Sequence, residues 1–212
     1  MCDAFAPKGD PRLSSIPHVF EGTPDSGTAF RTAYEAGRVP ATILRGTKPR
    51  VAWVTPIEEV NVVSNLPLFL DGVREKIEPF RFVACTGASE LIACALPADI
   101  VSCLPDCVVA LRKALVTQDR DSMAQAVILI KELTLKDSSV AKALVPFYRM
   151  LLTTLSKFKG FKRCTFDRMD FAKKDGRVIG ELIEETLDAL AATGGAHAVA
   201  NIKYLVAEWE YC

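Results

Sequence analysis

Three prolines at nearly equal spacing constrain the fold of this chain more than any other feature. Pro67, Pro105 and Pro146 each follow an apolar residue and lie 38 and 41 residues apart. Proline suits the first turn of an α-helix, because the N–H group that it lacks would have no partner there. The sequence therefore predicts that a helix begins at each of these prolines.

An apolar residue also recurs in register, six positions after each proline, at Val73, Leu111 and Leu152. A period near 40 built from helix pairs is typical of armadillo and HEAT α-solenoids, whose repeats run about 40–47 residues. Three unrelated proline-started helices are the alternative interpretation. The favoured fold is an all-α, armadillo- or HEAT-like solenoid that occupies residues 28–212.

Apolar periodicity predicts helices before and after these prolines. Residues 28–36 are expected to form a short helix that Gly37 stops. Residues 55–58 (TPIE) match a capping box, which predicts a helix from there to about Asn65. Further helices are expected over residues 80–96 with an interruption at Gly87, 104–116, 121–135, 138–158 with a kink or break at Pro146, 177–193 and 196–206. Residues 51–54 are expected to be briefly extended, and no sheet is predicted.

Two segments lack helical periodicity. Residues 1–27 hold three glycines and four prolines, which predicts an extended N-terminal arm, disordered alone or ordered on a partner. Residues 159–176 combine glycines with aromatic and basic residues, which indicates a long loop between packed helices.

The charge balance favours protein partners over nucleic acid or a membrane. Lys+Arg and Asp+Glu are equal at 26 each, so the chain has no overall basic character. The distribution is uneven, since residues 157–177 carry eight Lys/Arg against three Asp/Glu, and residues 178–212 carry one against six. A neutral protein with one basic and one acidic patch is expected to bind proteins, one of them acidic.

No catalytic, metal or cofactor site is expected. The two histidines, His18 and His197, lie far apart in sequence, and no nucleophile-elbow, P-loop or HExxH motif is present. Four of the seven cysteines are spaced C-x8-C-x8-C-x3-C, which lacks the two close pairs of a closed zinc site. The odd cysteine count and the lack of a signal peptide or long apolar run predict a cytosolic protein.

Two charged surfaces remain as candidates. Glu181, Glu184, Glu185 and Asp188 share helical spacing and predict a solvated acidic face, with docking of a basic partner as the alternative. The basic residues of the 159–176 loop and its flanks are interleaved with four phenylalanines. Docking on an acidic protein is favoured over stacking on single-stranded nucleic acid, and a solvated loop with no partner is the other possibility. These basic residues are Lys157, Lys159, Lys162, Arg163, Arg168, Lys173, Lys174 and Arg177.

Five blocks resemble the parkin co-regulated gene protein family in order and at compatible spacing. They are AFRTAYEAGRVP (residues 29–40), LPLFLDGVREKIEPFRFVACTG (66–87), ALVPFYRMLL (143–152), IGELIEETLDAL (179–190) and GGAHAVANIKYLV (194–206). The chain departs from the family's pattern after Val206, where it reads AEWEYC, and in the composition of the 159–176 loop.

This resemblance implies an armadillo-like helical fold and a place in the cytoskeleton, in the axoneme of cilia and flagella. It implies a structural role at the inner junction of the doublet microtubule, where the B-tubule closes onto the A-tubule. The implied partners are α/β-tubulin and a small β-sandwich protein, with no catalysis, cofactor, nucleic acid or membrane.

Because tubulin surfaces are acidic, basic side chains are the candidates for the tubulin contact. The alternative function is a soluble helical-repeat adaptor that binds a protein cargo during ciliary assembly. The candidate residues are Arg31, Arg38, Arg45, Lys48, Arg50, Lys159, Lys162, Arg163, Lys173 and Lys174.

Overall fold

The computed structural model describes residues 27–44, 46, 49–158, 179–206 and 209, and this part of the chain is mostly helical. Its α-helices are α1 (Ala29–Glu35), α2 (Val62–Asp71), α3 (Phe80–Cys94), α4 (Pro97–Val116), α5 (Arg120–Lys136), α6 (Ser138–Leu144), α7 (Tyr148–Leu155), α8 (Ile179–Thr193) and α9 (Ala196–Leu205). Short 3₁₀ turns are η2 (Ile57–Glu59), η3 (Gly72–Arg74) and η4 (Val145–Phe147), and the strands are β1 (Ala41–Leu44) and β2 (Arg50–Trp53). The predicted 1–27 arm lies outside the described residues except for Gly27, and the predicted 159–176 loop lies wholly outside them.

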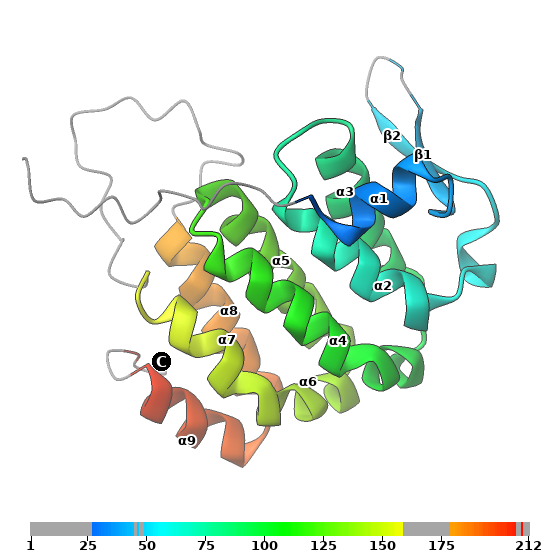
Figure 1. The fold of residues 1–212 in the computed structure, drawn as a ribbon. Helices are drawn as coiled ribbons and strands as arrows, with labels where there is room; N and C mark the ends of the chain where they lie inside the picture. Colours follow the sequence, from blue (N-terminus) through cyan, green and yellow to red (C-terminus); the bar gives the residue numbers. More distant parts are fainter. Residues whose placement is uncertain (1–26, 45, 47–48, 159–178, 207–208, 210–212) are drawn as a thin grey trace, which may run out of the picture.

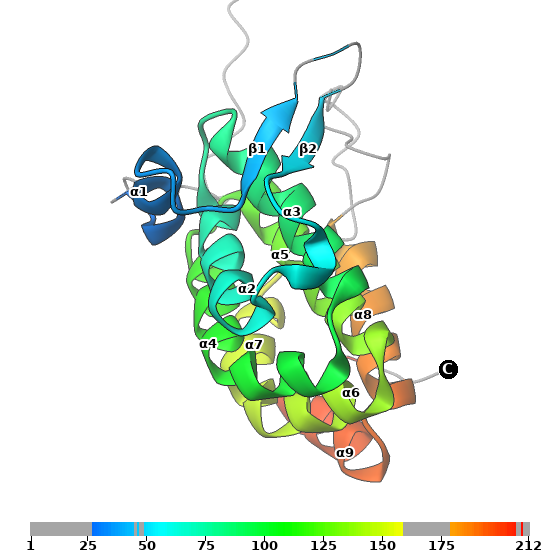
Figure 2. The ribbon, with the colours of Figure 1, turned by 90° about the vertical axis from the view of Figure 1, so that its right-hand side faces the viewer.

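Seven of the helices are arranged in two rows (Figures 1 and 2). In the first row α2 packs against α4, α4 against α7, and α7 against α9. In the second row α3 packs against α5, and α5 against α8. Successive helices of the chain alternate between the rows, while α6 joins α5 to the 3₁₀ turn before α7. The apolar faces meet between the rows in one continuous core.

Aromatic side chains fill the core at the N-terminal end. Phe30 of α1 and Trp53 of β2 both pack on Phe69 of α2, with ring centroids 5.2 and 5.6 Å apart. Tyr34 stands edge-on to Phe80 at 5.5 Å. Aromatic pairs at these separations add to the free energy gained by burying their area. They hold α1 and the strands against α2 and α3.

The prediction that the chain holds no sheet is wrong. Strands β1 and β2 form an antiparallel hairpin in which Ala41 pairs with Trp53 and Leu44 with Arg50. The extended segment predicted around residues 51–54 is confirmed as β2, but its partner β1 was missed. Strands of four residues are too short to display a clear alternation of apolar and polar positions. This hairpin is held by its packing on α3 instead.

Two of the three prolines predicted to begin helices lie inside them. Asn61 caps α2, which begins at Val62 and contains Pro67. Pro97 begins α4, which contains Pro105. An internal proline leaves the carbonyl four residues earlier without its helical partner. Because α2 begins at Val62 and α4 at Pro97, the predicted starts at Leu66 and Leu104 are wrong.

The helices tolerate these prolines because the affected turns face water. The carbonyl groups deprived of a helical partner belong to Val63 and Val101, and both residues are exposed. Water can then take the place of the missing N–H donor.

The third proline behaves as expected. Pro146 lies in the 3₁₀ turn η4, which divides the predicted 138–158 helix into α6 and α7 and confirms the break. The three prolines also belong to α2, α4 and the η4–α7 segment, which follow one another in the first row. The positions six residues later, Val73, Leu111 and Leu152, are all fully buried.

Two further local predictions are wrong. The capping box at residues 55–58 does not start a helix, because the 3₁₀ turn η2 has no side-chain cap and the chain becomes extended at the buried Val60. Gly87 does not interrupt α3, which runs through it. A Cβ atom at Gly87 would lie 2.3 Å from Phe69, so this glycine allows α2 and α3 to approach closely.

The short first helix is confirmed. The Thr28 hydroxyl oxygen accepts a hydrogen bond from the Arg31 N–H at 3.0 Å and caps α1. Gly37 follows the helix with a φ of +67°, a conformation that glycine adopts without strain. Of the helices in the described part of the chain, none is both long and apolar enough to cross a membrane.

Candidate partner-binding surface

Three of the ten predicted binding residues lie in the described part of the chain. Arg31 is on α1, Arg38 follows that helix, and Arg50 begins β2. All three belong to the end of the molecule formed by α1 and the hairpin (Figure 1). The other seven lie outside the described residues and are Arg45, Lys48, Lys159, Lys162, Arg163, Lys173 and Lys174.

These three arginines differ in their contacts. Arg31 pairs with Glu35 at 3.0 Å, and its guanidinium group lies 5.0 Å from the centre of the Phe80 ring. Much of its binding capacity is therefore used within the chain. Arg38 and Arg50 are exposed, at the base and at the tip-facing end of the hairpin respectively. They are the described candidates best placed to meet a partner.

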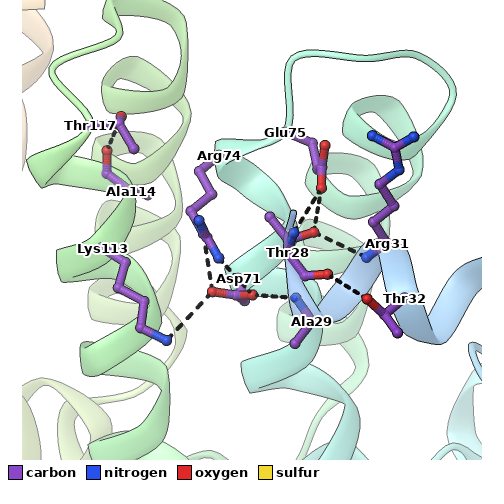
Figure 3. A network of polar contacts seen from close by, with 10 residues as sticks. All are labelled: Thr28, Ala29, Arg31, Thr32, Asp71, Arg74, Glu75, Lys113, Ala114 and Thr117. Atoms are coloured by element: carbon purple, nitrogen blue, oxygen red, sulfur yellow. Dashed lines mark hydrogen bonds and ion pairs between the residues drawn. The ribbon is translucent and has the colours of Figure 1, made fainter. Parts of the chain in front are cut away.

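Sequence reasoning missed a buried polar network that fixes the start of α1 (Figure 3). Glu75 is fully buried, and its Oε1 atom accepts hydrogen bonds from the Thr28 hydroxyl and, at 3.3 Å, from the Thr28 N–H. Asp71 accepts the Ala29 N–H at 2.9 Å. Two carboxylates thus meet the N-terminal end of α1, where the unpaired N–H groups carry partial positive charge.

Two cations compensate the charge of Asp71, which is almost completely buried. The Arg74 Nε atom lies 3.2 Å from Asp71 Oδ1, and the Lys113 Nζ atom lies 3.8 Å from the same oxygen. Burial of a carboxylate without such partners would be strongly unfavourable. The network therefore ties α1, the α2–η3 segment and α4 together (Figure 3). The sequence holds a sign of this network, since Asp71 and Glu75 are the first and last residues of the run DGVRE, which directly follows the apolar run LPLFL.

Next to this network, a cavity of about 450 Å³ opens between η3, α4 and α7. We call it the α4 groove. Arg112 and Lys113 line it beside the exposed Val109 and Val116. Its complete lining is Arg74, Val109, Arg112, Lys113, Val116, Thr117 and Met150.

The predicted acidic face lies at the surface of α8, and two of its carboxylates also make contacts within the chain. Glu185 pairs with Lys131 of α5 at 2.7 Å, and Asp188 accepts a hydrogen bond from the Trp209 indole N–H at 3.1 Å. Trp209 is only 4% exposed. Trp209, which follows the point where the chain departs from the family pattern, therefore packs against α8. Glu181 and Asp188 are exposed and the Glu185 side chain is 40% exposed, so the predicted acidic face is solvated even where it makes these contacts.

Two cysteines of α4 are buried in the core. Cys103 and Cys107 are buried one turn apart in α4, with their sulfur atoms 3.7 Å apart. The hydrogen bond to Cys103, together with burial, raises the pKa of the Cys107 thiol, which therefore stays protonated. Within the described ranges, no group of three His, Cys, Asp or Glu side chains is arranged to hold a metal ion. His197 is exposed on α9.

Comparisons with known proteins cover almost the whole helical part of the chain. A family model described as "Parkin co-regulated protein" matches residues 28–211. The chain is also 31% identical, over 195 residues, to the "Parkin coregulated gene protein homolog" of Mus musculus. That alignment covers 92% of this chain and 80% of the mouse protein.

Proposed function

Because the chain belongs to the parkin co-regulated protein family, we propose that it is a structural protein of ciliary and flagellar doublet microtubules. It would bind tubulin and a small β-sandwich partner at the inner junction, where the B-tubule closes onto the A-tubule. The observation that carries this proposal is the family match over residues 28–211.

The fold suits a building block. Two rows of helices around one continuous core form a body whose surfaces keep a fixed relation to each other. We propose that the rows represent an armadillo-like arrangement. The alternation of successive helices between the rows, with Pro67, Pro105 and Pro146 in successive segments of the first, supports it.

The tubulin contact would use the hairpin end of the molecule. Arg38 and Arg50 are exposed there, and Arg45 and Lys48 lie between them in sequence. An ion pair at an exposed rim contributes at most about 1 kcal/mol. A lattice that presents the same contact many times supplies the remaining affinity through multivalency.

Co-sedimentation with microtubules tests this contact. Charge reversal in the double variant R38E/R50E is expected to weaken binding at least about fivefold, since two favourable pairs become repulsive. The control K142E/K203E changes the same net charge at exposed positions on α6 and α9. Equal pelleting of the two variants would refute the assigned contact.

Localisation tests the larger proposal. A tagged copy is expected to remain on doublet microtubules of detergent- and salt-washed flagella, as density at the line where the B-tubule closes. If the salt wash removes the tagged protein, or if it is spread through the flagellar matrix, the protein is instead the adaptor that binds cargo during assembly.

A further inference from the structure

The α4 groove combines cationic side chains with exposed apolar side chains. Val109, Arg112, Lys113, Val116 and Thr117 follow one another at intervals of three, one, three and one residues, so they share one face of α4. Arg74 of η3 forms one wall and Met150 of α7 the other. Between Val109 and Thr117 the groove extends about 12 Å along the helix, at 1.5 Å per residue.

The charge of the groove is positive. Its lining holds three cations, and the neighbouring carboxylate is Asp71, which is already bonded to Ala29, Arg74 and Lys113. The Lys113 side chain is 58% exposed, so its ammonium group retains donors for a second partner. Arg112 is exposed and has no ion-pair partner among the residues that the structure describes.

The apolar part of the groove is exposed as well. Val109 is 45% and Val116 55% exposed, and they lie seven residues apart beside the half-buried Met150. Apolar side chains two turns apart on one helix are the usual contact points for the apolar face of an amphipathic segment. Cations beside them favour a segment that carries carboxylates.

We propose that the α4 groove binds an acidic amphipathic segment of a partner protein. Apolar side chains of this segment contact Val109, Val116 and Met150, while its carboxylates pair with Arg112 and Lys113. The proposal goes beyond the contact assigned to the hairpin end, and it rests on the proposed function only in that both require a protein partner.

Fluorescence anisotropy with the full-length protein tests the groove. The probe is a fluorescein-labelled synthetic peptide, EELLEELLEELL, and its charge-reversed counterpart is KKLLKKLLKKLL. The acidic peptide is expected to bind, and R112E/K113E to weaken it at least about tenfold, because two ion pairs are lost and reversed. V109S/V116S is expected to weaken binding about threefold or more through loss of apolar contact.

Matched controls separate the groove from general charge effects and from misfolding. K142E/K203E changes the net charge equally and is expected to bind as the unmodified protein does. The single variant R112E leaves the Lys113–Asp71 pair intact, and it should weaken binding with an unchanged melting temperature.

Three results would overturn the proposal. They are equal affinity of R112E/K113E and K142E/K203E, equal binding of the acidic and basic peptides, and self-association of the chain that R112E abolishes, which would assign the groove to a second copy. Microtubule co-sedimentation of R112E, measured in parallel, keeps the two proposals separable. If R112E loses peptide binding but still pellets with microtubules, the groove and the tubulin contact are separate sites. Loss of pelleting by R38E/R50E tests only the hairpin contact.

Discussion

At the scale of single residues, Thr28 both caps α1 and donates hydrogen bonds to a buried carboxylate. Its hydroxyl oxygen accepts the Arg31 N–H, and both its hydroxyl and its N–H donate to the buried Glu75. Thr28 itself is fully buried. The first helix is only seven residues long, too short to be stable in isolation. Its position therefore depends on this anchor and on the packing of Phe30.

Replacement of this threonine should accordingly destabilise the protein. Thr28→Ala is expected to lower the free energy of unfolding by about 1–2 kcal/mol, since it removes a helix cap and leaves Glu75 with one donor fewer. Urea denaturation measures the change. Thr32→Ala, one turn later on the exposed side of α1, is the control and should change stability by less than about 0.5 kcal/mol. Similar losses in both variants would contradict the role of Thr28.

A second residue gives the protein a dependence on alkaline pH. Tyr148 of α7 is buried, its hydroxyl donates to the Leu190 carbonyl at 3.3 Å, and burial raises its pKa to about 12. The pKa of an unfolded tyrosine is about 10. The fold therefore favours the neutral phenol, and this stabilisation is complete below about pH 10 and is lost as the pH rises towards about 12.

Urea unfolding of Y148F beside the unmodified protein, over this pH range, measures the effect. The unmodified protein should lose about 1–2 kcal/mol more than the variant between about pH 9 and pH 12, allowing for solvent screening. All groups other than Tyr148 are common to the two proteins, so their contributions to the difference cancel. Parallel stability curves would show that Tyr148 makes no such contribution.

At the scale of elements, the internal prolines are the departure from helix rules with the clearest energetic consequence. A proline inside a helix costs roughly 3 kcal/mol relative to alanine, and one at the first position costs little. Pro105 lies inside α4 on the exposed side, and Pro97 begins the same helix. The two positions form a matched pair within one element.

Pro105→Ala should therefore raise the free energy of unfolding by about 1–3 kcal/mol, because it restores an N–H donor for the Val101 carbonyl. Pro97→Ala should leave stability unchanged or slightly lower it. Thermal unfolding followed by circular dichroism distinguishes the two variants. No gain from Pro105→Ala would mean that the proline shapes α4 in a way that the packing requires.

The elements also show where prediction from the sequence succeeds. Helices α5, α8 and α9 were predicted well in their described parts, because their apolar spacing is regular and their neighbours impose nothing unusual. The proline rule placed the starts of α2 and α4 too late, because tertiary packing overrode a local preference. Gly87 was misread for a related reason, since its role depends on the Phe69 ring of another helix.

The candidate site was predicted less well than the fold. Exposed arginines can be chosen from sequence, but nothing local shows that Arg31 is held by Glu35 and Phe80. The α4 groove joins residues up to 76 positions apart, from Arg74 to Met150. Such a surface exists only once the helices are packed, so no periodicity or motif could indicate it.

At the scale of the whole molecule, the chain holds two tryptophans that report on its opposite ends. Trp53 packs on Phe69 beside the hairpin, while Trp209 packs against α8. Both ends share one continuous core. The single-tryptophan variants W53F and W209F are expected to unfold in urea at the same midpoint by fluorescence as by circular dichroism, as for one cooperative unit. Two separate midpoints would show that the two ends of the molecule unfold independently.

The alternation of the helices between two rows has a consequence for synthesis on the ribosome. The helices of the N-terminal half pack on near neighbours in the chain, so α2, α3 and α4 can bury apolar surface against one another before α8 and α9 have been translated. The face of α5 that packs on α8 has to wait longer, since Lys131 of α5 and its partner Glu185 of α8 lie 54 residues apart. Trp209 can close over α8 only after α9 has been translated.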